Sequence, residues 1–382
     1  MNKDSKIYIA GHRGTAGAAL VENLQNRGFR NLILKTRAEL DLTNQRAVQN
    51  LFEVEKPEYV FLCAVLPCGA ANVAQRADFI YDNLMIQNNI IHQSYLNNVE
   101  KLICYGSGYM YPYLAQNPLK EECMLGGNLE YGAYTFGIAK IAQAAMCEAY
   151  NIQYGTNFLC LALNNLYGTR ANFDFGKSRV LPALIRKFHL AKMLEDDNFE
   201  GVLKDLGLDE SESKEVLDKI GVSSKSVEIW GTGKVKREFI HSDDLADVSI
   251  FVMQNINFKD LIDNSEPQNT HINVGSGAAY SIAEVAQMVK EIVGFKGDLK
   301  FNDQRPDSTM DRLMDVSRIH SLGWKHKINL EQGIKMMYEW YSSQYLGGGG
   351  GYYSSHCLKF TSYQSLNNRN FIADSRKRIC NA

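Results

Sequence analysis

The stretch Ile7-Tyr8-Ile9-Ala10-Gly11-His12-Arg13-Gly14-Thr15-Ala16-Gly17 decides the fold of this chain. It joins a short apolar run to a GxxGxxG turn, and apolar residues at helical spacing follow as far as Arg27. Glycines in such a turn permit a tight bend, let the backbone approach a pyrophosphate and allow close packing of helix on strand. The helix N-terminus adds free N–H groups. The stretch therefore predicts a dinucleotide site that includes Gly11, Gly14, Thr15 and Gly17.

Outward from this turn, short apolar runs alternate with helical patterns as far as about residue 170. The runs Leu32-Ile33-Leu34, Tyr59-Val60-Phe61-Leu62 and Lys101-Leu102-Ile103-Cys104-Tyr105 are nearly continuous in apolar residues, which fits strands covered on both faces. Strands that alternate with helices favour right-handed βαβ units and a parallel sheet. We predict an α/β fold, with a Rossmann-type doubly wound parallel sheet and a smaller α/β C-terminal substrate domain.

The predicted dinucleotide-binding domain spans 1–170, with segments at about 235–250 and 270–280 returning to it, and the substrate domain spans 171–346. Residues 191–226 are rich in Asp, Glu and Lys with apolar residues at helical spacing, which predicts an inserted helical hairpin at the surface. A run of five glycines, Gly347 to Gly351, opens a polar and aperiodic segment. We predict that 347–382 is a flexible tail.

The composition is that of an ordinary soluble globular protein. Of 382 residues, 45% are hydrophobic and 22% are charged, and the formal net charge of -2 gives no global attraction to nucleic acid or to an anionic membrane. No apolar run reaches the ~18 residues that a membrane span needs. The eight cysteines are scattered without a CxxC pair. We therefore expect a cytoplasmic protein with reduced thiols and no metal site.

The end of the second predicted strand indicates which dinucleotide binds. Binders of NAD usually carry an acidic residue there to hold the ribose 2′-OH. This chain has Leu34-Lys35-Thr36-Arg37 instead, and Arg13 lies in the glycine turn. Two guanidinium groups can fork onto a 2′-phosphate, so we predict NADP(H), bound by Arg13 and Arg37. Asp41 and Leu42 are expected beside the adenine.

Further stretches resemble the extended short-chain dehydrogenase/reductase family and, within it, the GDP-L-fucose synthases. The matches include Ala77-Asp78-Phe79-Ile80-Tyr81, Asn165-Leu166-Tyr167-Gly168, Val180-Leu181-Pro182-Ala183-Leu184 and Arg237-Glu238-Phe239-Ile240-His241. The resemblance runs from about residue 6 to 345, apart from the insertion. It implies a homodimer that reduces a GDP-4-keto sugar, with Ser107 and Lys140 in the catalytic site. Lys140 lies in a predicted helix at 134–150, one turn after position 136.

The same resemblance implies where the GDP-sugar is held. The implied substrate residues are Asn165, Arg179, Val180, Leu184, Lys187, Trp230, Arg237, Arg305 and Arg312. An aromatic ring such as that of Trp230 can stack on a base, and an arginine can fork onto a phosphate. Core packing for Trp230, and surface ion pairs for Arg305 and Arg312, are the alternatives.

Two departures from the family concern its epimerase chemistry, which uses a cysteine and a histidine. Those positions hold Tyr109 and Arg179 here. Removing a proton next to a ketone needs groups poised near neutral pH, and an arginine cannot act as a base. We predict that epimerisation is lost and that a separate C3/C5 epimerase acts in the pathway. The expected substrate is a GDP-4-keto-(6-deoxy)-heptose or a related GDP-4-keto-hexose, used for capsule or other surface polysaccharide sugars.

The third departure is Phe136, at the position of the family's catalytic tyrosine. A phenyl ring cannot give a proton to the alkoxide that hydride transfer creates. The chain is then an inactivated variant, an enzyme with another donor such as Tyr109 or Tyr134, or a non-catalytic NADP(H)-binding relative. Tyr109 is the better placed of the two donors because Tyr134, two residues from 136, points away along the helix. Retention of the full epimerase/reductase activity is a further alternative.

Overall fold

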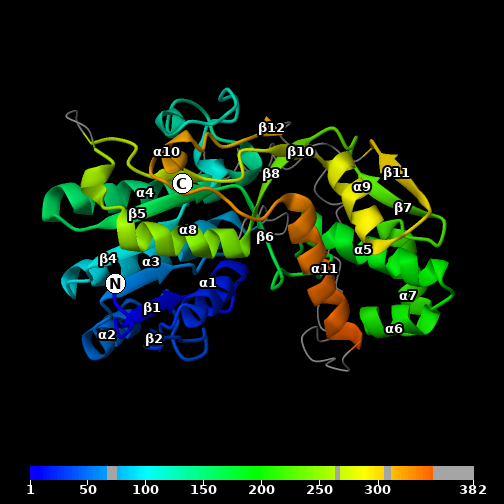
Figure 1. Cartoon of the computed structure of the whole chain (residues 1–382), viewed down its shortest axis with the longest axis horizontal. Helices are drawn as coiled ribbons and strands as arrows, with labels where there is room; N and C mark the ends of the chain where they lie inside the picture. The colour runs from blue at the N-terminus through cyan, green and yellow to red at the C-terminus, as the bar shows by residue number, and fades with distance from the viewer. Residues whose placement is uncertain (67–74, 263–266, 305–310, 347–382) are drawn as a thin grey trace, which may run out of the picture.

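The computed structural model describes residues 1–66, 75–262, 267–304 and 311–346. The predicted tail and Arg305 lie outside these residues. Figure 1 shows the chain as a large parallel sheet with its helices at one end and a second group of helices and short strands at the other. Among the described residues, no helix is both long and apolar enough to span a membrane.

The large sheet has six parallel strands in the order β2-β1-β3-β4-β5-β9. Their bounds are β1 Ile7–Ala10, β2 Leu32–Ile33, β3 Tyr59–Leu62, β4 Lys101–Tyr105, β5 Phe158–Leu163 and β9 Ile272–Val274. Every residue of β1, β3, β4 and β5 is buried, as the apolar runs predicted. Strand order reverses between β1 and β3, and ligands of doubly wound sheets bind outside the carboxyl ends at such a point. The predicted fold class is confirmed.

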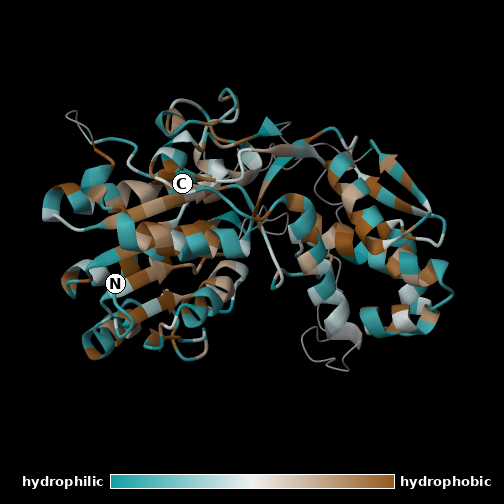
Figure 2. Ribbon diagram, in the orientation of Figure 1, coloured by the Kyte–Doolittle hydropathy of each residue, from teal (hydrophilic) through white to brown (hydrophobic). Residues whose placement is uncertain are grey.

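Helices cover both faces of this sheet. On one face α1 (Thr15–Asn26) packs along α8 (Ser242–Asn255), and on the other α2 (Gln45–Glu55), α3 (Arg76–Leu96) and α4 (Tyr134–Tyr154) pack in sequence. The short helix α10 (Ser317–Ser321) also joins this core, through Ile319. Apolar residues gather on the strands and the inner helix faces, as Figure 2 shows. Helices on both faces exclude water from the sheet. Polar side chains that can bind a ligand therefore lie at the ends of the strands.

The other end of the molecule has a core of its own, built mainly on α5 (Val180–Glu195), α9 (Ile282–Val293) and α11 (Leu330–Leu346). The parallel pair β7 (Ser226–Trp230) and β11 (Asp298–Asn302) covers it. We call this the second core. A four-stranded sheet links the two ends and contains β6 (Asn165–Tyr167), β8 (Lys236–His241), β10 (Ala279–Ser281) and β12 (Asp311–Arg312). Segments far apart in the sequence thus meet between the two cores.

The inserted segment is helical, but the predicted bounds are wrong at both ends. Helix α5 continues to Glu195, so the insertion proper consists of α6 (Phe199–Leu206) and α7 (Glu210–Ile220), and Ser226 already belongs to β7. Side chains of Asn198 and Asp209 cap the two helices at their N-termini, and glycines in the left-handed region end them. Val202 and Ile220 are buried in the second core. The insertion is therefore a packed part of that core.

Candidate active site

A cavity of 540 Å³ opens at the carboxyl ends of β1, β3, β4 and β5, where the two ends of the molecule meet. Gly11, Cys63, Ser107 and Asn164, each just after one of these strands, line it. Its far wall comes from the segment before α5 and from β8 and β12. The cavity therefore lies where a doubly wound sheet binds its ligand.

The glycine turn forms one end of this cavity, called here the cofactor end. Gly11 has a φ of +87°, and a β carbon there would lie 2.6 Å from the backbone nitrogen of Ala64. At Gly17 a β carbon would lie 2.3 Å from the carbonyl oxygen of Gly11, so this glycine lets α1 pack closely on the turn. Gly17 is not part of the cavity lining. Gly14 begins α1 without a side-chain cap. The first N–H groups of α1 are therefore available to a phosphate.

Basic and acidic side chains follow at the end of β2. Arg37 lines the cavity, and so does Lys35, which the sequence reasoning overlooked although it stands in the same basic run. Arg13 is exposed on the glycine turn and lies outside the lining. Asp41 also lines this end, and hydrogen bonds from the N–H and the hydroxyl of Thr43 lower the pKa of its carboxyl. Lys35 and Arg37 are therefore the two basic side chains placed in the lining where a 2′-phosphate is expected.

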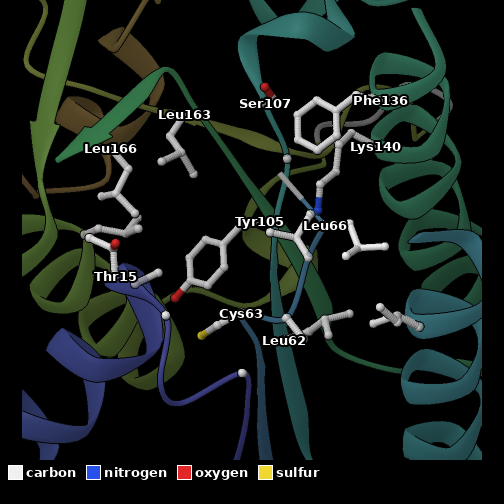
Figure 3. Close-up of a pocket in the computed structure, with 18 of the residues that line it drawn as sticks. Thr15, Leu62, Cys63, Leu66, Tyr105, Ser107, Phe136, Lys140, Leu163 and Leu166 are labelled. Atoms are coloured by element: carbon white, nitrogen blue, oxygen red, sulfur yellow. The ribbon is translucent and has the colours of Figure 1, made fainter. Parts of the chain in front are cut away.

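Ser107 and Lys140 both line the cavity. Ser107 follows β4, and its Oγ accepts a hydrogen bond of 3.3 Å from the N–H of Tyr109. Lys140 reaches in from α4 beside Phe136 (Figure 3), and its Nζ donates to Oε1 of Gln143 at 3.1 Å. Burial lowers the pKa of Lys140, partly offset by the nearby thiols of Cys104 and Cys160. Lysine and serine therefore share one side of the site.

Gln143 is a functional neighbour that the sequence reasoning missed. Its Nε2 donates to the carbonyl oxygen of Tyr105 at 3.1 Å, while its Oε1 holds Lys140. The side chain is only 1% exposed. The sequence could have identified it by its position, because it lies one turn after Lys140 on the same helix face. Gln143 thus ties the lysine to the end of β4.

Phe136 occupies the centre of this group as an apolar ring. It is 6% exposed, its ring centroid lies 5.9 Å from the Nζ of Lys140, and the ring of Tyr109 meets it edge-on at 6.2 Å. Phe79 contacts it from α3 at 5.9 Å. The ring excludes water from Lys140 but offers no hydroxyl.

Tyr109 brings a phenol to the cavity, whereas Tyr134 does not. The guanidinium of Arg312 lies 4.8 Å from the Tyr109 ring centroid and donates to the carbonyl of Gly108 at 2.6 Å and to Glu130 at 2.9 Å. Tyr134 is 48% exposed and lies outside the lining. Arg312 forms an ion pair with Glu130, as the alternative expected, but the guanidinium is buried and not at the surface.

The remaining polar groups define the sugar end of the cavity, opposite the cofactor end. Asn165, Arg179 and Arg237 all line it. The Nδ2 of Asn165 donates to the carbonyl of Glu238 at 2.9 Å, and burial lowers the pKa of Arg237. Glu238 was not predicted. Its buried carboxylate accepts from Asn164 and from two backbone N–H groups, so it joins β5, β8 and β12.

Four of the implied substrate residues lie away from the cavity surface. Val180 begins α5, and Leu184 is buried in the second core. Lys187 donates to the carbonyl of Glu228 at 2.8 Å and lies 5.1 Å from the ring centroid of Trp230. Trp230 is 50% exposed, so core packing is the wrong alternative for it. The described residues hold no cluster of His, Cys, Asp or Glu arranged to bind a metal.

Comparison with known proteins agrees with this arrangement. The model of the NAD dependent epimerase/dehydratase family matches residues 7–275. A GDP-6-OMe-4-keto-L-xylo-heptose reductase from Campylobacter jejuni is 72% identical with a TM-score of 0.88, covering 90% of this chain and 99% of that chain. A GDP-mannoheptose C4 reductase from Campylobacter jejuni with NADP bound is 71% identical with a TM-score of 0.83, over the same shares.

Similarity extends to the fucose synthases. The GDP-L-fucose synthase of Escherichia coli is 40% identical over 337 residues, which is 88% of this chain and 96% of that protein. The resemblance inferred from the sequence motifs is confirmed. The chain belongs to the NAD dependent epimerase/dehydratase family, within the extended short-chain dehydrogenases/reductases.

Proposed function

We propose that this chain is an NADPH-dependent reductase that converts the C4 carbonyl of a GDP-4-keto-heptose to an alcohol. The observation that carries the proposal is the 72% identity to a GDP-6-OMe-4-keto-L-xylo-heptose reductase over 90% of the chain. The cavity supports it with the glycine turn, two cations at the end of β2, and Ser107 beside Lys140. A 6-deoxy heptose or a related hexose belongs to the same substrate class.

NADPH, when bound, supplies the hydride that reduces the carbonyl carbon. The hydroxyl of Ser107 orients the carbonyl oxygen, and Lys140, held by Gln143, binds the nicotinamide ribose. The alkoxide left at C4 then needs a proton. Tyr109 donates it, because its phenol is on the cavity surface, and Arg312 and Arg237 lie close enough to stabilise the phenolate that remains.

The replacement of both epimerase groups supports a pure reductase. Arg179 is exposed just before α5, and an arginine side chain cannot remove a proton from carbon. The configuration at C3 and C5 is then set before this enzyme acts, by a separate C3/C5 epimerase.

Phe136 favours a second candidate function, a non-catalytic NADP(H)-binding relative. Without a phenol at 136, Lys140 has no catalytic hydroxyl one turn before it. This candidate and an inactivated variant share one outcome, namely that the chain binds NADPH without turnover.

The test is NADPH oxidation with an enzymatically prepared GDP-4-keto-heptose in deuterated water, followed by NMR of the product. Turnover without deuterium at C3 and C5 is expected. Deuterium at either carbon would show retained epimerase activity. NADPH binding without turnover would favour the non-catalytic relative.

We also propose a homodimer formed through α3 and α4, acting in the cytoplasm on the route to capsule sugars. Leu96, Ile152 and Tyr154 on these two helices are 53%, 56% and 45% exposed, and Tyr154 stacks on Tyr95 at 4.1 Å. Such an apolar face suits a contact between copies. Light scattering should give the mass of two chains, and a monomer would contradict the proposal.

A further inference from the structure

The insertion carries a buried carboxylate into the second core. Asp205 lies in α6, and its side chain is 1% exposed. Its Oδ1 accepts from Nε of Arg186 on α5 at 2.8 Å, and its backbone carbonyl accepts from Nη2 at 2.9 Å. The hydroxyl of Tyr341 on α11 donates to the other carboxylate oxygen. A buried ion pair with this many hydrogen bonds joins three helices in one arrangement.

The same guanidinium also holds a segment that has no regular secondary structure. Nη1 of Arg186 donates to the carbonyl of Phe173 at 3.2 Å, and the guanidinium lies 5.0 Å from the ring centroid of Phe175. Phe173 is fully buried, and its ring lies 4.4 Å from that of Tyr341. We call residues 168–179, between β6 and α5, the connecting loop. Its two phenylalanines contact Arg186 and Tyr341.

Other residues of the connecting loop line the cavity. Ala171, Asn172, Lys177 and Arg179 all belong to the lining. Most other hydrogen bonds of the loop stay within it, such as those that Asp174 accepts from the N–H groups of residues 176 to 178. One bond from Thr15 to the carbonyl of Arg170 ties it to α1. On the side of the second core, Arg186 links the insertion to the cavity wall through its bonds to Asp205 and to the carbonyl of Phe173.

We propose that Arg186 and Asp205 are positioning residues for the sugar nucleotide: the ion pair that the insertion supplies holds the connecting loop against the cavity. This inference rests on the proposed function only in the identity of the ligand. The loop contributes Asn172, Lys177 and Arg179 to the cavity lining, whereas the glycine turn and the end of β2 contribute Gly11, Gly14 and Arg37. Loss of the ion pair should therefore weaken the binding of the sugar nucleotide and leave the binding of NADPH unchanged.

The test uses Asp205→Asn in the full chain, which keeps the shape of the side chain and removes the charge. We measure the Kd of GDP-mannose and of NADPH by calorimetry, and hydrogen exchange in residues 168–179. The Kd of GDP-mannose should rise about tenfold or more, as loss of a hydrogen bond to a charged group implies. Exchange in the loop should accelerate by a similar factor, and the Kd of NADPH should stay within about twofold.

A double variant, Arg186→Met with Asp205→Leu, separates positioning from stability. Replacing a buried ion pair by apolar side chains is often neutral for folding. With Tyr341→Phe added, so that no buried hydroxyl loses its acceptor, this variant should melt near the parent temperature but keep the weaker GDP-mannose binding, because the carbonyl of Phe173 has lost its donor. The matched control is Glu210→Gln, which breaks an exposed pair with Lys214 in the same insertion and should change neither affinity.

Equal losses of both affinities, or unchanged exchange in the connecting loop, would overturn the positioning role. If the parent protein binds no GDP-mannose at all, the proposed substrate class is wrong. The exchange measurement then still decides whether the pair holds the loop.

Discussion

The cofactor end of the cavity is shaped by backbone, whereas the sugar end is shaped by side chains. At the cofactor end, Gly11 and Gly17 allow contacts that any β carbon would prevent. At the sugar end, Tyr109, Phe136 and Arg179 come from three separate segments. A change at the first end disturbs the fold of the turn. A substitution at the sugar end can replace a reacting group and leave the sheet unchanged. The three departures expected from the family motifs, Tyr109, Phe136 and Arg179, all lie there.

The largest effect should come from Tyr109→Phe. Removing a proton donor typically costs 10²–10⁴-fold in rate, so kcat should fall by about that factor. The Kd of NADPH should stay the same because the variant leaves the glycine turn untouched. Stopped-flow NADPH oxidation and fluorescence titration measure the two quantities. A kcat within about twofold of the parent would rule out Tyr109 as the donor.

Phe136→Tyr should rescue that variant. A phenol at 136 lies one turn before Lys140 and next to the Tyr109 ring, so in the Tyr109→Phe background it should restore activity by about 10²-fold. In the parent, where a donor is already present, the same change should alter kcat by less than about tenfold. A parent that is inactive until Phe136 becomes tyrosine would instead identify an inactivated variant.

Gly17→Ala should weaken NADPH binding. Its new methyl group would lie 2.3 Å from the carbonyl oxygen of Gly11, so the turn must move, and overpacking of this kind costs about 1–3 kcal/mol of stability. Restoring the binding geometry of the turn takes back up to that amount, so Kd should rise by up to roughly 150-fold. The matched control is Gly132→Ala, outside the cavity lining, where a methyl group would meet no atom within 4 Å. Equal effects of the two variants would contradict a turn shaped by backbone contacts.

The smallest effect on activity concerns His271, which directly precedes the edge strand β9. Burial lowers its pKa from 6.5 to about 3. Below pH 6.5 the unfolded chain protonates this histidine and the folded protein does not. The free energy of unfolding is therefore unaffected above pH 6.5 and falls by about 1.4 kcal/mol per pH unit as the pH drops toward 3.

His271→Gln should therefore flatten the acid limb of a plot of unfolding free energy against pH, measured with urea. Glutamine can keep a hydrogen bond to Tyr111, which His271 contacts at 2.9 Å. His326→Gln, at a half-buried histidine between α10 and α11, is the control. An unchanged slope for His271→Gln would mean that this residue does not titrate as described.

The contiguous parts of the site could be predicted from the sequence, and the assembled parts could not. Strand, glycine turn and helix follow one another within residues 7–26, so local spacing was sufficient for them. Ser107 and Lys140 also followed from spacing and from the family resemblance. Gln143 was within reach of the same argument, because it lies one turn beyond Lys140.

Other features depend on contacts between distant segments. Glu238 joins strands that are separated by long stretches of chain, and Arg312 is buried only because Glu130 and Gly108 meet it there. The acidic composition of the insertion suggested a solvated surface. Asp205 is buried nonetheless, because Arg186, 19 residues earlier on α5, neutralises it.

Strand β9 has a consequence for how such enzymes can diversify. It forms the edge of the large sheet although it follows the first helices of the second core, and α8 returns to pack along α1. The polypeptide passes back and forth between the two ends, so neither can be cut away and exchanged as a cassette. Point substitutions at the cavity, and added segments such as α6 and α7 that pack on the second core, leave every crossing of the chain in place.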